Sequence, residues 1–145
     1  MSSAELLRIK EDCEATEMES NLSKFTSELE RLVRDGRLLS IALLRDLKLL
    51  DDKSEKETRE LKLPNFKERY ESWYSLSLQA VKQVLPDRLA DFVRLYKDEK
   101  RKTLDVVTYS VSDYMIGVQV TRYGEVVVDR NTVLSKFMQQ LNIVR

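Results

Sequence analysis

Two carboxylates and a lysine near the middle of the chain have the spacing that most suggests chemistry. Pro86-Asp87 is followed by Asp98-Glu99-Lys100, an order in which metal-dependent nucleases carry the groups that hold Mg²⁺ and a water molecule. The intervening residues predict a single helix, on which Asp87 and Asp98 would lie roughly 16 Å apart, too far to share an ion within one chain. A metal-dependent nuclease would then require two chains that bring Asp87 and Asp98 together. We therefore interpret Asp87 as a helix N-cap and Asp98 as part of a solvated turn.

The chain contains no histidine and only one cysteine. Since histidine is the commonest general acid or base at neutral pH and a frequent zinc ligand, Ser-His-Asp triads, Cys-His dyads and His-ligated zinc are excluded. The three isolated glycines form no phosphate-binding loop. The sequence predicts a protein that is not an enzyme, with no catalytic, metal-binding or cofactor-binding residues and no cofactor.

A basic turn, KDEKRK, is the remaining polar candidate. Its cations are Lys97, Lys100, Arg101 and Lys102. They could contact phosphates, but acidic residues interrupt the run, and a solvated face is the more common role of such a segment. A nucleic-acid-binding component that uses this turn is our alternative hypothesis. The balance of 25 basic and 25 acidic residues argues against it.

Composition indicates which elements must position these side chains. The chain has 145 residues, enough for one domain, and with only 3 Gly and 2 Pro it is typical of long helices joined by few turns. We expect a single all-α domain over 1–145, an antiparallel bundle of about five to six helices. An N-terminal helical arm or hairpin would occupy 1–62 and a helical core 63–145.

The longest apolar run, 38–44, is much shorter than the roughly 20 residues of a membrane span. The acidic N-terminus lacks the apolar segment of an export signal. We therefore expect no membrane association and a cytoplasmic location.

An apolar stripe follows the first predicted helix at intervals of four, three, four and three residues. Its members are Met18, Leu22, Phe25, Leu29 and Leu32. The spacing predicts either a coiled-coil arm that pairs with a second copy or a partner, or a long helix that packs within its own bundle. The stripe covers about two heptads, fewer than a coiled coil usually needs, which favours the second interpretation. Gly36 then indicates a cap or a kink.

Four aromatic residues share one face of a helix that would begin near Pro64 and end at Pro86: Phe66, Tyr70, Trp73 and Tyr74. Such a face can stack on single-stranded bases, but an aromatic stripe at helical spacing is more often part of a core. We expect these side chains in the core.

The segment from Lys100 to Val120 is rich in residues that favour strands, yet its apolar residues recur with a helical period. They are Leu104, Val107, Val111, Met115 and Val118. Because packing outweighs intrinsic propensity, we expect a helix there. Across 118–128, two valine-rich runs leave a short β-hairpin and an extended loop as alternatives.

The last predicted helix carries an apolar face with Phe137, Leu141 and Val144, and the chain stops at Arg145 without a capping residue. We expect a partner, or a further part of the same protein, to cover this face.

Three segments resemble the N-terminal part of a family of uncharacterised bacterial proteins. They are ESWYSLSLQAVKQVLPDRLADF, KRKTLDVVTYSVSDYMIGVQVTRYGEVVVD and KFMQQLNIV, and the likeness covers roughly 65–144. In that family a further helical half follows, similar to the HEPN-type domains of toxin–antitoxin and phage-defence systems. The resemblance implies a helical fold and a bacterial regulatory or defence role. HEPN ribonucleases use an Arg and His motif, so no catalytic residue carries over to this chain, which has no His.

Our leading hypothesis is a non-enzymatic helical module for protein–protein interaction or oligomerisation. Its partner would be a second copy or a second polypeptide, and not a membrane. The predicted interface residues are Met18, Leu22, Phe25, Leu29, Leu32, Phe137, Leu141 and Val144.

Overall fold

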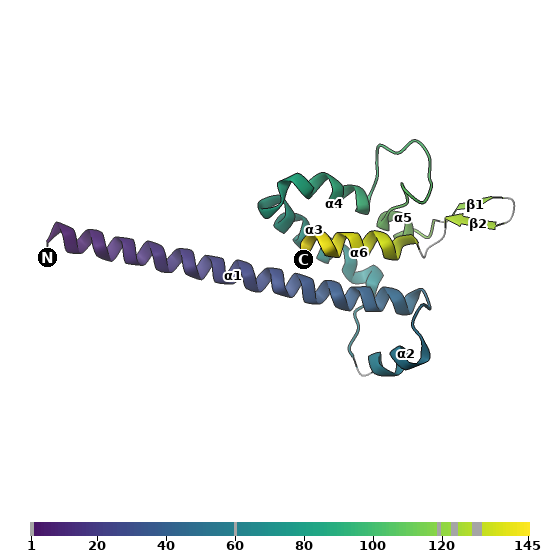
Figure 1. Ribbon diagram of the computed structural model, residues 1–145, viewed down its shortest axis with the longest axis horizontal. Helices are drawn as coiled ribbons and strands as arrows, with labels where there is room; N and C mark the ends of the chain where they lie inside the picture. The colour runs from purple at the N-terminus through teal and green to yellow at the C-terminus, as the bar shows by residue number, and fades with distance from the viewer. Residues whose placement is uncertain (1, 60, 119, 123–124, 129–131) are drawn as a thin grey trace. The chain divides into compact units, whose positions relative to one another are not determined.

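The computed structural model of the chain describes residues 2–59, 61–118, 120–122, 125–128 and 132–145. Most of these residues are helical, which confirms the all-α class (Figure 1). The helices are α1 (Ser3–Asp46), α2 (Asp52–Thr58), α3 (Phe66–Val84), the 3₁₀ turn η1 (Pro86–Arg88), α4 (Leu89–Tyr96), α5 (Val111–Met115) and α6 (Thr132–Val144). Among the described residues, no helix combines the length and the apolar character that crossing a bilayer requires.

The chain divides into two compact units, Met1–Arg31 and Leu32–Arg145, named here the arm and the body. The division does not fall at 62/63, where we expected arm and core to meet. The second part of α1 belongs to the body because it supplies Leu39, Ala42 and Leu43, which are almost fully buried. Helix α2, by contrast, buries no residue and begins at an N-cap, where Asp51 accepts a hydrogen bond from the Ser54 amide at 2.7 Å.

The core of the body lies where α3, α4 and α6 contact one another. Phe66 and Tyr70 of α3 are fully buried, and Trp73 is 4% exposed. Phe137 of α6 meets the Phe66 ring edge-on at 5.3 Å between centroids and lies 5.1 Å from the Trp73 ring. The prediction that the aromatic face is core is confirmed.

Burial of α6 corrects an expectation from the sequence. Phe137 and Leu141 are 0% and 1% exposed within the body, and Val144 is half-buried. The chain's own helices therefore cover the apolar face that we expected a partner to cover, because α3 and α4 supply the facing side chains.

Gly36 neither caps nor ends α1, which continues to Asp46. A Cβ at this position would lie 2.6 Å from Leu141 Cδ1 and 3.1 Å from Trp73 Nε1. Trp73 Nε1 also donates a hydrogen bond to the Leu32 carbonyl oxygen at 2.8 Å. The glycine is needed here for close packing against side chains of α3 and α6, and not to end the helix.

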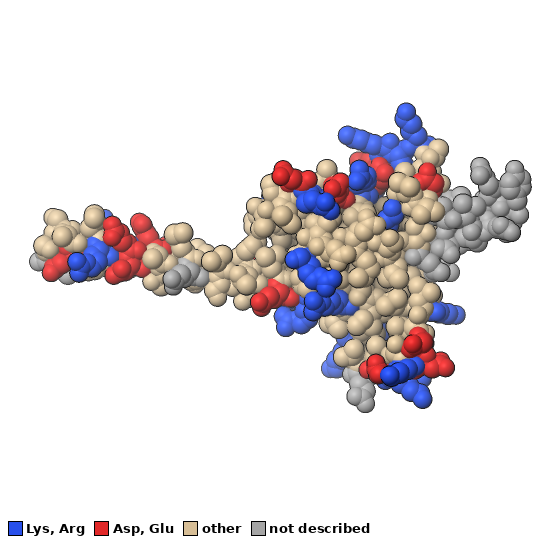
Figure 2. Space-filling model, viewed as in Figure 1, with Lys and Arg blue, Asp and Glu red and all other residues tan. Residues whose placement is uncertain are grey.

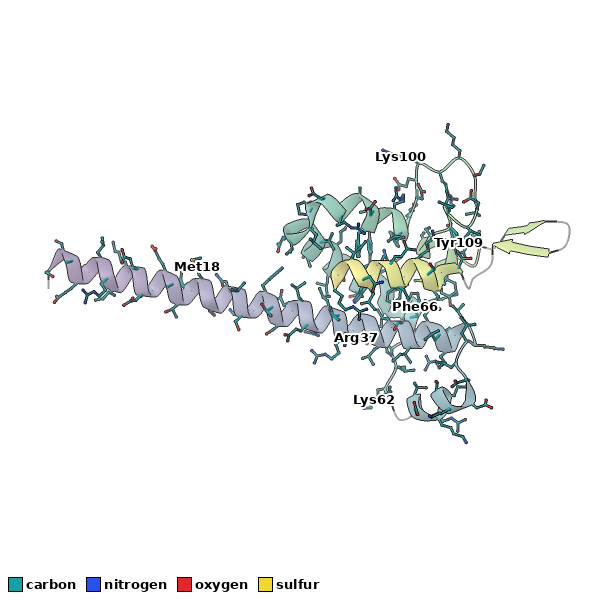
Figure 3. The ribbon with its side chains drawn as sticks, in the orientation of Figure 1. Met18, Arg37, Lys62, Phe66, Lys100 and Tyr109 are labelled. Carbon is teal, nitrogen blue, oxygen red and sulfur yellow. The ribbon has the colours of Figure 1, made fainter. Side chains whose placement is uncertain are left out.

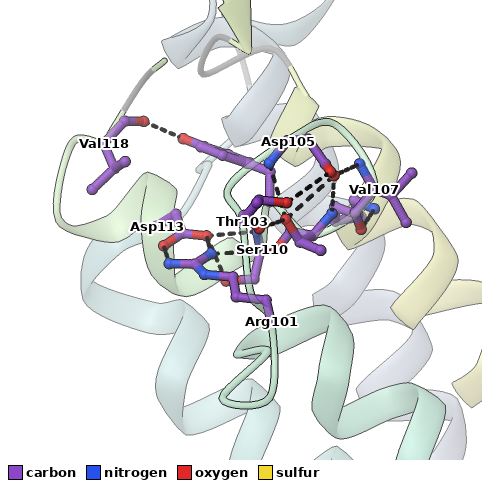
Figure 4. Close-up of polar contacts among 10 residues, drawn as sticks. Arg101, Thr103, Asp105, Val107, Ser110, Asp113 and Val118 are labelled. Carbon is purple, nitrogen blue, oxygen red and sulfur yellow. Dashed lines mark hydrogen bonds and ion pairs between the residues drawn. The ribbon is translucent and has the colours of Figure 1, made fainter.

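The helix expected between Lys100 and Val120 is restricted to α5, so that prediction is wrong for the residues before Val111. The Asp105 carboxylate accepts hydrogen bonds from the amides of Val107 and Thr108, at 2.9 and 3.0 Å (Figure 4). These side-chain hydrogen bonds take the place of the i to i−4 backbone hydrogen bonds of a helix, and the segment forms a turn. Asp side chains often compete with helical hydrogen bonding in this way. Val107, which the helical period had placed on the apolar face, is 81% exposed.

Beyond α5, strand β1 (Val120–Arg122) pairs antiparallel with β2 (Glu125–Val128), with an irregularity between Val120 and Thr121. The pairing falls within the predicted 118–128 segment, and the residues that join the two strands lie outside the described ranges.

Candidate interaction surface

The arm starts from a local hydrogen-bonding pattern at its N-terminus. Ser2 Oγ accepts from the Glu5 amide at 3.3 Å, and the Ser2 amide donates back to the Glu5 carboxylate at 3.2 Å. This reciprocal capping box satisfies backbone donors that have no partner within the helix. It gives the arm a defined helical start.

The described part of the arm, unlike the body, has no buried core of its own. Among its described residues none is buried. Met18 and Leu22 are 72% and 66% exposed, and Figure 3 labels Met18 on α1. Phe25 and Leu29 are half-buried, whereas Leu32, the last member of the stripe, is buried in the body. The stripe is therefore part of the core at Leu32, but its side chains are exposed at Met18 and Leu22.

Most positions beside the stripe are acidic, and the others are neutral. If Leu22 and Leu29 occupy heptad positions a, and Met18 and Phe25 positions d, the flanking e and g positions of the sequence carry Asp12, Glu14, Glu19 and Glu28. No e or g position between residues 12 and 28 carries Lys or Arg. Over Met1–Arg31 there are eight acidic and four basic residues, and red side chains outnumber blue ones on the visible face of the arm (Figure 2). An apolar stripe with acidic borders is therefore the candidate surface.

The basic turn does not form a single cationic patch. Arg101 lies beside Asp113, donating through both Nη atoms to the two carboxylate oxygens, one bond at 2.9 Å (Figure 4). Lys97 Nζ lies 3.7 Å from the Glu99 carboxylate. Lys100 and Lys102 are exposed, and Figure 3 labels Lys100 on the loop. The guanidinium group of Arg101 is therefore engaged within the body by its ion pair with Asp113.

Ionisation of this pair follows its geometry. Burial by itself would raise the pKa of Asp113, but hydrogen bonds from Arg101 and Ser110 outweigh burial, and the pKa is lowered. The same bond to Asp113 raises the pKa of the Arg101 guanidinium. The pair is charged at neutral pH, and because it anchors the loop to α5 it is a structural element.

The carboxylates that suggested a metal site flank the two ends of α4. Asp87 is within η1, whereas Asp98 follows the end of α4 at Tyr96. Asp87 is not an N-cap either, because Leu85 precedes η1 and Arg88 precedes α4 in that position. Within the described residues, no three side chains of the metal-binding types come together.

A depression of about 470 Å³ lies between η1, α4 and α6. Its lining includes Arg88 and Arg94, which both lie close to the Asp91 carboxylate, at 3.8 and 3.0 Å. The Asp91 carboxylate partly neutralises both guanidinium groups, and all three side chains are partly exposed to water. The depression therefore lacks the buried, unpaired positive charge that would bind an anion.

No protein-family model, curated protein or solved structure matches this chain. The resemblance to bacterial helical proteins therefore stays a prediction.

Two sets of residues were missed in reading the sequence for sites. The first set is the acidic residues at heptad positions e and g, which follow directly from the sequence once Met18 is placed at position d and Leu22 at position a. Asp113 had a weaker signal, the Ser110-x-x-Asp113 spacing of a capping box.

Proposed function

We propose that this protein is a helical interaction module, in which the body is a bundle-like scaffold and the arm binds another polypeptide through the Met18–Leu29 stripe. The proposal includes no chemical step. A place in a bacterial regulatory or defence system, in the cytoplasm, rests on the resemblance and on the sequence alone.

One contrast supports the proposal above others. The body buries a core of large apolar side chains around Phe66 and Phe137, although it exposes others such as Ile116. In the arm, by contrast, no described residue is buried, and Met18 and Leu22 are largely exposed. A helix usually owes its stability in water to packing of its apolar face. Exposed apolar residues at heptad spacing therefore favour a surface that is covered on binding.

The nucleic-acid alternative has less support. Arg101 is engaged with Asp113, and the aromatic side chains proposed for base stacking, Tyr70 and Trp73, are buried. Lys100 and Lys102 remain exposed on the turn, but contacts from such cations to phosphates would carry no sequence information.

The chain offers a convenient reporter for a binding experiment. Cys13 is the single cysteine, is exposed and falls at heptad position f, away from the stripe. A fluorophore at Cys13 would follow, by anisotropy, the binding of synthetic amphipathic helices with Leu at positions a and d and Gln at e and g. Light scattering on the same samples would record self-association.

We expect either helix binding or self-association, and in both cases Leu22→Ser should weaken it by at least about tenfold, the factor that 1.4 kcal/mol gives. The matched control is Ile116→Ser, which removes a similarly exposed apolar side chain, 75% exposed, from the body. The proposed function would be overturned if the chain stayed monomeric and bound none of the synthetic helices, whatever the charge of their e and g residues. Equal effects of Leu22→Ser and Ile116→Ser on binding would overturn it as well.

A further inference from the structure

The proposed function, on which this inference rests, leaves open what kind of helix covers the arm. The charges beside the stripe narrow the choice. In a two-helix coiled coil, residues at e and g of one helix lie beside e or g residues of the other and set partner and orientation. On the arm the acidic members of these positions in the sequence are Asp12, Glu14, Glu19 and Glu28, and the other two, Asn21 and Thr26, are neutral.

A second copy of the arm fits this pattern poorly. In a parallel pair, each g residue lies near an e residue of the other helix, and in an antiparallel pair e meets e and g meets g. Since e and g positions 12–28 contain no Lys or Arg, neither orientation brings a positive charge to Asp12, Glu14 or Glu28. Self-pairing would place carboxylates near one another, which is unfavourable at low ionic strength.

The apolar positions supply the other half of the argument. Met18 has a flexible, unbranched side chain and Leu22 a side chain branched at Cγ, and both are mostly exposed. Toward the N-terminus the stripe ends, because position d at residue 11 is Glu11. The apolar contact region therefore runs from about residue 15 to Leu29, a length of roughly 20 Å along the helix.

We propose that the arm binds a basic amphipathic helix of another polypeptide, with apolar residues at a and d over about two heptads and Lys or Arg at e and g. Apolar contacts with Met18, Leu22, Phe25 and Leu29 supply the affinity. The carboxylates of Asp12, Glu14 and Glu28 select for a positively charged partner and against a second copy of the arm.

The test uses the full chain labelled at Cys13 and three synthetic helices that differ only at e and g, which carry Lys, Gln or Glu. At low salt we expect the Lys helix to bind at least about tenfold more tightly than the Gln helix, from several weak ion pairs acting together. The Glu helix should bind more weakly than the Gln helix. Raising the ionic strength to about 0.5 M should shrink these differences, because screening shortens the range of charge interactions.

A pair of variants with equal net charge separates local from general electrostatics. Glu14→Gln with Glu28→Gln removes two negative charges beside the stripe, whereas Ser20→Lys with Ser27→Lys adds two positive charges at f positions on the opposite face. We expect the first pair to lose about three- to fivefold in affinity for the Lys helix and the second to lose less than about twofold. Equal losses would contradict selection by the flanking carboxylates.

The outcomes separate this inference from the proposed function. If the Gln and Lys helices bind equally and Leu22→Ser weakens both, the arm is an interaction surface but the charge selection is wrong. If the chain forms dimers through the arm, as a loss of dimers in Leu22→Ser would reveal, the partner is a second copy and the inference is overturned. If nothing binds and the chain is monomeric, both proposals fail.

Discussion

Arg101 and Asp113 form a two-pronged ion pair that ties the turn after α4 to the first turn of α5 (Figure 4). The Asp113 carboxylate also accepts hydrogen bonds from the amide and hydroxyl groups of Ser110, at 2.9 and 3.0 Å. A cation that the sequence suggested for phosphate binding is therefore used to hold an irregular segment in place.

Replacing this carboxylate should destabilise the body. We expect Asp113→Asn to lower the free energy of unfolding by about 2 kcal/mol, since it weakens several hydrogen bonds and leaves Arg101 without its counter-charge. Urea denaturation would measure the change. Asp87→Asn, at an exposed position in η1, is the matched control and should change stability by less than about 0.5 kcal/mol.

The same residue predicts how stability depends on acid. The pKa of Asp113 is lower in the folded chain than its ordinary value of 3.8, so its ionised form stabilises the fold above about pH 4, and that contribution is lost as the pH falls below 4. In Asp113→Asn this part of the acid dependence should be absent. Unfolding midpoints in urea between pH 3 and 7, measured for both proteins, would show the two curves converging toward low pH. Parallel curves would contradict the assignment.

A side chain at position 36 should clash with Leu141, and shortening Leu141 should relieve the clash. A Cβ at Gly36 would approach Leu141 Cδ1 to 2.6 Å, so Gly36→Ala should cost about 1–2 kcal/mol although alanine is the better helix former. Leu141→Ala alone should cost about 2–5 kcal/mol by leaving a cavity. Because the new methyl group would occupy part of that cavity, the double variant should be more stable than the sum of the two losses implies. A double-mutant cycle by urea denaturation measures this coupling, and strict additivity would contradict the close approach.

A buried hydrogen bond joins α3 to α6. The Tyr70 hydroxyl donates to Gln140 Oε1 at 2.6 Å, and Gln140 Nε2 donates onward to the Phe92 carbonyl oxygen at 3.2 Å. Tyr70→Phe leaves the Gln140 oxygen buried without its donor, and we expect a loss of about 1–3 kcal/mol in unfolding free energy. Tyr96→Phe is the control, because its hydroxyl contacts Glu71 at the surface at 3.3 Å and should contribute less than about 0.5 kcal/mol.

The tyrosines of the core should resist ionisation. Burial raises the pKa of Tyr70 well above 10, and burial together with the nearby Tyr96 raises the pKa of Tyr74 to about 12. A raised pKa in the folded state means that these groups contribute stability below about pH 10, which is lost as the pH rises through 10 toward 12 and beyond. Absorbance at 295 nm should show these tyrosines ionising only above pH 10, with alkaline unfolding. Normal titration of all tyrosines before any loss of helical circular dichroism would contradict this.

Arm and body should respond differently to the same kind of change. Leu22→Ala removes an exposed side chain and should change the unfolding free energy by less than about 0.5 kcal/mol, whereas Leu43→Ala removes a fully buried one and should cost about 2–5 kcal/mol. Thermal and urea unfolding of the two variants, measured at a concentration where the chain is monomeric, would check the contrast. A large loss in Leu22→Ala would mean that this side chain packs within the chain.

Composition and periodicity alone determined the helical class, the breaks at Pro64 and Pro86, and the burial of Phe66, Tyr70 and Trp73. These features follow from local rules, since proline interrupts hydrogen bonding and an apolar face must leave water. Tertiary structure decided the rest. Gly36 continues a helix because two other helices pack closely there, and Lys100–Ser110 forms no helix because Asp105 and Asp113 bind nearby backbone and side-chain groups. The stripe from Met18 to Leu32 has one period throughout, yet only the fold buries Leu32 and leaves Met18 exposed, because the facing side chains come from segments distant in the sequence.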